Sequence, residues 1–131
     1  MTEHEIVQNL LYMREITNSD TLDFITVLFA YAVLAHFVGA SLSRIVAVTA
    51  SALYSIYTLA TLMSLAGLLR SQKMLGQRLH DLYPAASEYL PAYENVFLGG
   101  IILVVFPLGM GWLFSLYYMH IYIRRGNDES A

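Results

Sequence analysis

The chain has 131 residues, of which 57% are hydrophobic and only 13% are charged, against roughly 25% charged residues in an ordinary soluble domain. This leaves too little polar surface for a water-soluble fold, and a net charge of -3 does not favour nucleic-acid binding through bulk electrostatics. Without cysteine, the chain offers no disulfide, thiolate nucleophile or cysteine metal site.

Residues 1–20 are predicted to form a short amphipathic helix. Its apolar residues Ile6, Leu10 and Met13 recur at helical spacing. Acidic and polar residues occupy the rest of the helical wheel. Such a helix is typical of a segment that lies on a membrane surface or against the rest of the protein. An acidic start without a basic flank does not resemble a signal peptide. The stretch 18–21 is expected to end this helix, with Asp20 capping the start of the next.

Three uninterrupted apolar runs follow, each long enough to cross a bilayer, which takes about 20 residues: residues 22–42, 45–69 and 96–123. The predicted fold class is therefore an all-α membrane protein with three transmembrane helices, in one domain. The very short link between the first two spans predicts a tight antiparallel hairpin with Arg44 at its tip.

Span two is predicted to continue beyond the bilayer. Residues 70–82 keep helical spacing of leucines, and nothing breaks the helix decisively before Pro84. We therefore expect one helix of almost forty residues, with residues 70–94 forming a helical extension and a connector. Span three carries a kink signal, Pro107 with Gly109 and Gly111, and the tail 126–131 is expected to be disordered.

The positive-inside rule hardly separates the two orientations. Four basic residues near the membrane lie on the side of the amino terminus (Arg14, Arg70, Lys73, Arg78), and three lie on the other side (Arg44, Arg124, Arg125). We expect a cell inner membrane protein with a cytoplasmic amino terminus, because an uncleaved polar terminus is easier to leave there.

Span two has a hydroxyl-rich side. Seven serine, threonine and tyrosine residues fall within about one half of its wheel at 100° per residue, and aliphatic residues occupy the other half. One interpretation is helix packing, in which each interhelical hydrogen bond contributes about 0.6 kcal/mol. The other is a hydrated pathway, which requires several copies of the chain because three helices cannot enclose a water-filled pore. The predicted pore-lining residues are Ser51, Tyr54, Ser55, Thr58 and Thr61.

His36 lies within span one between Ala32 and Ala40, with Gly39 close by. Small residues around a bulky polar one indicate a face pressed against another helix. An ionisable residue in a span is a candidate for function, so one interpretation of His36 is a role in gating, proton relay or ligand binding. The other is a neutral histidine whose hydrogen bond comes from a hydroxyl of span two. The candidates for gating or helix packing are His36, Pro107, Gly109 and Gly111.

His120, near the end of span three, resembles part of an interfacial aromatic belt with Tyr117, Tyr118 and Tyr122. His36 and His120 lie on spans that run the same way, each a few residues from the end. Two histidines at one depth are what a b-type haem would need. Haem b held by this pair is therefore the alternative to a protein without a cofactor.

The one basic cluster of note lies on the extension of span two and contains Arg70, Lys73, Arg78 and His80. Attraction to anionic lipid headgroups is one interpretation. A site for an anionic regulator such as a nucleotide or oligonucleotide is the other. No motif indicates an enzyme, since the sequence has no glycine-rich phosphate loop, HExxH or GxSxG.

In outline the chain is similar to the small multi-span effectors of bacterial anti-phage defence systems. The likeness rests on the acidic amphipathic start, the three tight spans with a hydroxylated face, and the basic helical extension. It implies a homo-oligomeric channel or pore that disrupts the membrane potential and answers to a nucleotide-type signal.

The alternative function is a non-catalytic membrane anchor of a larger respiratory-type complex. The size and the number of spans resemble the membrane anchors of succinate dehydrogenase. The His-Arg-x-Ser/Thr-Gly pattern expected of one such anchor is absent, which counts against haem and quinone roles.

Overall fold

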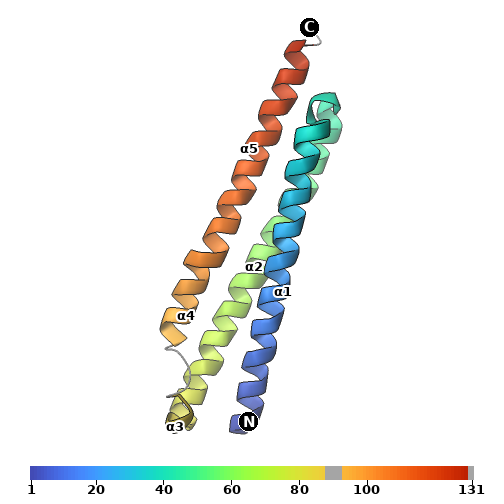
Figure 1. Ribbon diagram of the computed structural model, residues 1–131. Helices are drawn as coiled ribbons and strands as arrows, with labels where there is room; N and C mark the ends of the chain where they lie inside the picture. Colours follow the sequence, from blue (N-terminus) through green and yellow to red (C-terminus); the bar gives the residue numbers. More distant parts are fainter. Residues whose placement is uncertain (88–92, 130–131) are drawn as a thin grey trace. The chain divides into compact units, whose positions relative to one another are not determined.

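The computed structural model describes residues 1–87 and 93–129, and across them the chain is almost entirely helical, with no strand (Figure 1). In chain order the elements are α1 (Glu3–Val38), a 3₁₀ turn (Gly39–Ser41), α2 (Arg44–Leu82), α3 (Pro84–Ser87), α4 (Tyr93–Gly100), a π-helical turn (Ile101–Val105) and α5 (Phe106–Glu129). Three helical segments are long and apolar enough to cross a membrane: Glu3–Ser41, Arg44–Leu82 and Phe97–Gly126. The predicted all-α class with three apolar helices is confirmed.

The chain divides into two compact units. Unit 1 consists of Met1–Leu22 and Met63–Pro107, and unit 2 consists of Asp23–Leu62 and Leu108–Ala131. Because the boundaries fall inside α1, α2 and α5, each of these helices contributes residues to both units.

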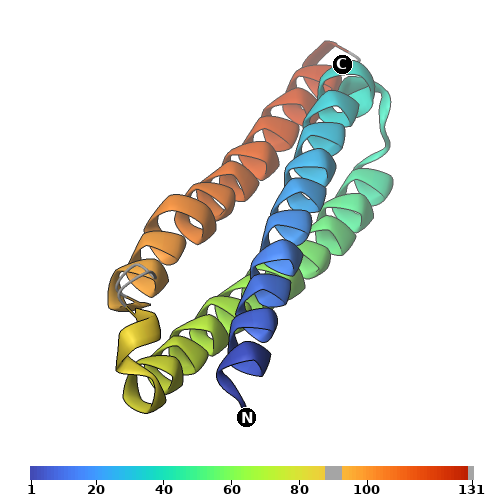
Figure 2. The same ribbon diagram turned by 60° about the horizontal axis from the view of Figure 1, so that its bottom comes forward.

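Helix α1 is continuous over 36 residues, and Figure 2 shows its ribbon without interruption. It begins with a capping box, in which the Thr2 amide donates to Glu5 Oε2 at 2.8 Å and the Glu5 amide donates to Thr2 Oγ1 at 3.4 Å. The predicted break at residues 18–21 is wrong, and residues 1–20 are not a separate helix. The hydroxyls of Thr17 and Thr21 donate to carbonyls one turn back, at 2.8 and 2.7 Å, so these residues continue the helix instead of capping a new one.

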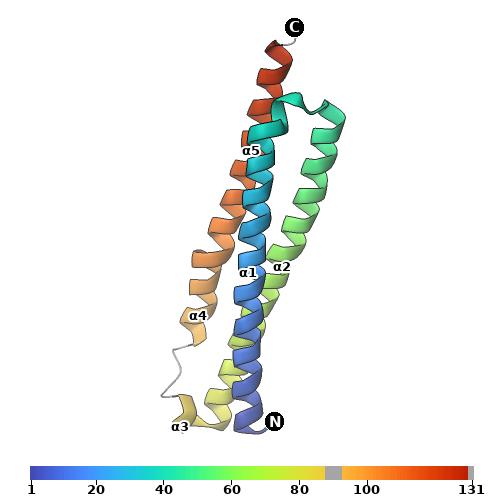
Figure 3. The ribbon, with the colours of Figure 1, turned by 45° about the vertical axis from the view of Figure 1, so that its right-hand side comes forward.

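Helix α2 has 39 residues, as the sequence predicts, and it follows α1 after a short link (Figure 3). The link contains the 3₁₀ turn and two further residues, so the tight hairpin is present. The helix ends at Leu82, two residues before Pro84, because proline has no amide proton and disfavours helical geometry at the residue before it. How far α2 extends beyond a bilayer stays a prediction. Residues 88–92 of the predicted connector lie outside the described residues.

The helical run from α4 to α5 contains an irregularity just before Pro107. Residues Ile101–Val105 form a π-helical turn, and the amide of Phe106 donates to the carbonyl of Ile101. A proline ring collides with the carbonyl four residues before it, and a wider π turn relieves that collision. The irregularity therefore lies where the sequence predicts a kink, and a hinge function at this point stays a prediction.

Helix α5 continues to Glu129, so residues 126–129 of the tail predicted to be disordered are helical, while residues 130 and 131 lie outside the described part of the chain. Gly126 lies against the link that follows α1, where a Cβ would collide with the carbonyl oxygen of Ala40. This close approach extends the packing of α5 beyond the last arginine.

Candidate functional site

Two stacked tyrosines form the centre of unit 2. Tyr31 of α1 and Tyr54 of α2 are both buried, with 4.0 Å between ring centroids and 8° between ring planes. A buried tyrosine hydroxyl needs a hydrogen-bond partner, and both have one. The Tyr31 hydroxyl bonds to Ser51 Oγ at 2.7 Å, and the Tyr54 hydroxyl bonds to Ser115 Oγ at 3.1 Å. Polar side chains therefore join α1, α2 and α5 within this unit.

The hydroxyl-rich side of α2 has further partners. Trp112 Nε1 donates to Ser55 Oγ at 3.3 Å, and Ser51 Oγ also donates to the carbonyl of Ala47 at 2.8 Å. Three of the five predicted pore-lining residues, Ser51, Tyr54 and Ser55, thus hold α1 or α5 within a single chain. These contacts are those of helix packing, and a lining role for the three residues stays a prediction.

Thr58 and Thr61 differ from those three. Thr61 Oγ1 donates to the carbonyl of Tyr57 within its own helix at 3.0 Å. Thr58 is fully buried. Its hydroxyl makes no hydrogen bond of standard geometry to any residue in the described part of the chain, although the Tyr54 hydroxyl is near enough to interact with it. Buried hydroxyls without a full hydrogen bond are rare in folded proteins, so Thr58 is an exception within unit 2.

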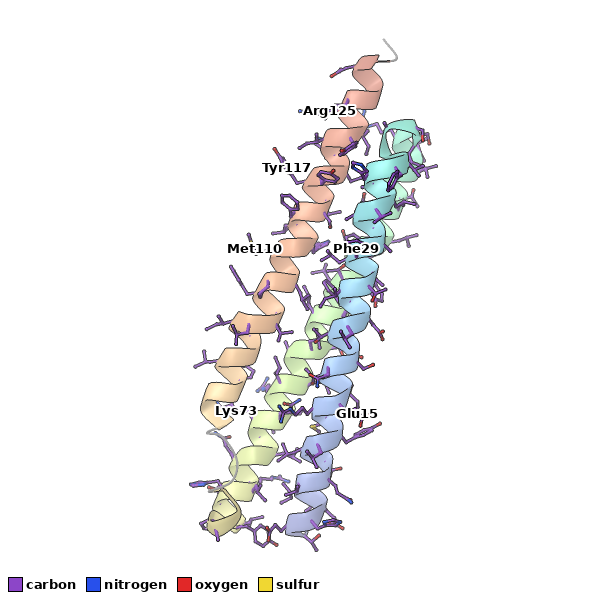
Figure 4. All side chains as sticks on the ribbon, viewed as in Figure 1. Glu15, Phe29, Lys73, Met110, Tyr117 and Arg125 are labelled. Atoms are coloured by element: carbon purple, nitrogen blue, oxygen red, sulfur yellow. The ribbon has the colours of Figure 1, made fainter. Side chains whose placement is uncertain are left out.

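His36 lies in a cluster with two tyrosines of α5. Its Nδ1 is 3.0 Å from the hydroxyls of both Tyr118 and Tyr122, and the Tyr118 hydroxyl donates to that of Tyr122, also at 3.0 Å. The interpretation in which a span-two hydroxyl satisfies His36 is wrong, since its partners come from α5. Tyr118 and Tyr122 thus belong to this cluster, whereas Tyr117 is exposed (Figure 4).

Beside the cluster lies a groove with a volume of about 460 Å³, lined by residues of α1 and α5. Leu28 and Gly111 contribute to its walls, and a Cβ added to Gly111 would lie 2.8 Å from Leu28 Cδ1. The missing side chain of Gly111 therefore lets the two helices approach. Gly109, the other glycine of the predicted kink, has open space around it.

His120 faces a different cavity, of about 270 Å³, which Ser51 and Met119 also line. Tyr118 and Tyr122, which contact His36, each lie two residues from His120, and two residues correspond to about 200° around an α-helix. His120 is therefore on the opposite face of α5. The two histidines of the alternative haem site line separate cavities, and the chain does not bring them together.

The basic residues of the α2 extension belong to unit 1. Lys73 Nζ lies 5.6 Å from the centre of the Phe97 ring, a cation–π distance, and Lys73 is labelled in Figure 4. Arg70, Arg78 and His80 have exposed side chains. Binding of an anionic ligand or of headgroups by this cluster stays a prediction.

Sequence reasoning missed a buried polar bond in unit 1. Gln72 Nε2 donates to Thr17 Oγ1 at 2.9 Å, and both side chains are buried. A signal was present, because Gln72 lies three residues after Leu69 and seven before Leu79, on the one buried stripe of this part of α2. A lone polar residue on such a stripe indicates a partner on a neighbouring helix.

Comparison of the chain with protein-family models, with curated proteins and with solved structures found no match.

Proposed function

We propose that the protein is a membrane protein that assembles with copies of itself into a transmembrane channel. The observation that carries this proposal is the presence of polar side chains on the outer surface of unit 2. His36 and His120 are exposed, and Tyr57 is 41% exposed. Ionisable and hydroxyl groups that face acyl chains are costly, so we expect other protein surfaces or water to cover them.

The exposed area supports assembly as well. Within the single chain, only 22%, 17% and 6% of the most apolar windows of the three helical segments are buried. Packing between membrane helices is driven by close van der Waals contact and by interhelical hydrogen bonds. Both remain available to neighbouring copies, because so little of the span surface is used inside one chain.

In the proposed channel the hydroxyl side of α2 borders the pathway, and its residues divide into two roles. Ser51, Tyr54 and Ser55 keep the helices together through their bonds to α1 and α5. Thr61, whose side chain is partly exposed, offers its hydroxyl oxygen to a hydrated path. Its one hydroxyl proton goes to the carbonyl of Tyr57, so the lone pairs of its oxygen remain for water. Thr58 is fully buried within the single chain, and it borders the path only where the helices around it part.

Ion flux through liposomes tests the proposal. We expect Thr61→Val to reduce the flux severalfold, since the substitution removes one oxygen from a partly exposed side chain and keeps its shape. The matched control is Thr49→Val, the same change at an exposed position of α2 outside the predicted lining. Equal flux in Thr61→Val and wild type would remove the lining assignment, and no flux in wild type at any condition would remove the channel and favour a membrane anchor.

A further inference from the structure

Two backbone carbonyls of the third apolar segment lose the hydrogen-bond donors that a regular α-helix supplies. The amide of Phe106 donates to Ile101 across the π-helical turn, instead of to Ile102, which lies four residues before it. The carbonyl of Leu103 would accept from residue 107, which is a proline without an amide proton. No side chain of the described residues donates to either carbonyl. Ile102 and Leu103 therefore present freed acceptors within a segment that can cross a membrane.

The freed carbonyls belong to residues on the outer surface of unit 1. Ile102, Leu103 and Phe106 are 60%, 77% and 64% exposed, and Pro107 is exposed as well. All four residues lie in unit 1, and none of their side chains is a hydrogen-bond donor. A backbone carbonyl that faces hydrocarbon without a donor is costly. We therefore expect a donor from outside the chain to cover this surface.

Ser64 of α2, in the same unit, is a donor without an acceptor. Its side chain is exposed, and its hydroxyl bonds to none of the described residues, whereas the hydroxyl of Thr61 bonds back to its own helix. A side chain as short as serine reaches the backbone of another helix only when the two helices are close. Gly67 permits this approach, because it lies on the same face as Ser64 and no atom lies within 4 Å of the position that its Cβ would take.

The donor and the acceptors lie at a similar level of unit 1. A Cβ added to Gly100 would lie 2.6 Å from Leu69 Cδ2, so the two antiparallel segments meet at these residues. Ser64 precedes Leu69 by five residues, and Ile102 and Leu103 follow Gly100 by two and three, so both steps lead away from the connector. At about 1.5 Å per residue, the levels differ by only about 3 to 4.5 Å.

We propose that the Ser64 hydroxyl of one copy donates to the freed carbonyl pair of residues 102 and 103 in the next copy. The donor and the acceptors lie on different segments of one unit, so the contact is head-to-tail, and each copy keeps a donor or an acceptor for a further copy. Contacts of this kind close into rings. The inference rests on the proposed self-assembly and names the two surfaces that carry it.

Cysteine cross-linking tests which surfaces meet, since the chain has no cysteine of its own. Ser64→Cys and Leu103→Cys are made in separate chains, co-expressed in one membrane and oxidised with copper phenanthroline. We expect disulfide-linked dimers from the mixture and few from either variant alone, because a disulfide needs Cα atoms within about 7 Å. Met74→Cys is the control for Ser64→Cys. It is exposed on α2, about 15 Å along the helix from Ser64, and it should not link to Leu103→Cys.

A pair of substitutions tests the hydrogen bond itself. Pro107→Ala restores an amide proton to the helix, so the freed carbonyls regain donors within their own chain. We expect Pro107→Ala and Ser64→Ala each to weaken association about threefold, the effect of one interhelical hydrogen bond. The double variant should associate no more weakly than either single variant. Energy transfer between labelled copies during dilution in detergent measures this, and losses that multiply would overturn the proposal.

The cross-linking outcomes separate this proposal from the channel. Cross-links as strong in each single variant as in the mixture would show a two-fold interface and overturn the proposal. A particle with several copies but without the mixed cross-link would show that water or lipid covers the freed carbonyls, and it would overturn the proposal while leaving the channel. A particle with a single copy would overturn both.

Discussion

Units 1 and 2 use buried polar groups in different ways. In unit 1 the buried pair of Gln72 and Thr17 is closed, because Gln72 donates to Thr17 and Thr17 donates to a backbone carbonyl. In unit 2 a larger network joins three helices, and among the described residues it leaves the buried Thr58 Oγ1 without a hydrogen bond of standard geometry. A closed pair stabilises a fold, whereas a buried hydroxyl without a full hydrogen bond lowers its stability.

The largest expected effect concerns the tyrosine stack of unit 2. Tyr54→Ala removes a buried ring and leaves a cavity beside Tyr31, so we expect a loss of about 3 kcal/mol in the free energy of unfolding. Thermal unfolding in detergent, followed by circular dichroism, measures it. Tyr57→Ala, on the same helix but at an exposed position, should change stability by less than about 0.5 kcal/mol. Similar losses in the two variants would mean that the stack is not a core element.

A smaller effect is expected in unit 1. Gln72→Leu keeps the size and the apolar character of the buried stripe and removes the bond to Thr17, so we expect a loss of about 1 kcal/mol. Gln77→Leu, at an exposed position of the same helix, is the control. If Gln72→Leu were as stable as the control, the bond would not contribute to the fold, and the contrast between the two units would disappear.

The smallest effect has the opposite sign. Thr58→Val replaces a buried hydroxyl that makes no full hydrogen bond by a methyl group of similar shape, and it should leave stability unchanged or raise it by up to about 1 kcal/mol. Chemical unfolding of the purified variant measures this. A clear loss of stability would show that the hydroxyl has a partner in the folded protein, and Thr58 would then be a structural residue.

The sequence predicts those features that depend on one segment at a time. The three spans follow from apolar runs, and the end of α2 follows from Pro84. The predicted break at residues 18–21 is absent. Serine, threonine and aspartate favour a helix cap only where their side chains do not bond back to the helix backbone. The hydroxyls of Thr17 and Thr21 do bond back, to carbonyls one turn earlier. The helical tail depends on a close approach of Gly126 to Ala40, which no local pattern reveals.

The candidate site could be predicted only in part. Periodicity identifies the hydroxyl side of α2 and marks His36 as a polar residue on a packed face. Periodicity does not say which helix packs on that face, so the hydrogen bonds from His36 to Tyr118 and Tyr122 could not be predicted from the sequence. Tyr118 and Tyr122 do share one face of α5, since they are four residues apart, and that spacing separates them from His120. Membership of an interfacial aromatic belt depends on depth in the membrane and not on the helix face, so the belt stays a prediction.

The mass of the native particle tests most directly whether the exposed polar groups of unit 2 are covered by further copies of the chain. Wild-type protein extracted into nanodiscs from the expressing membrane would be weighed by native mass spectrometry. Assembly into a channel predicts a particle with several copies of the 14.7 kDa chain and no foreign subunit. A particle with a single copy, alone or bound to other proteins, would contradict the account.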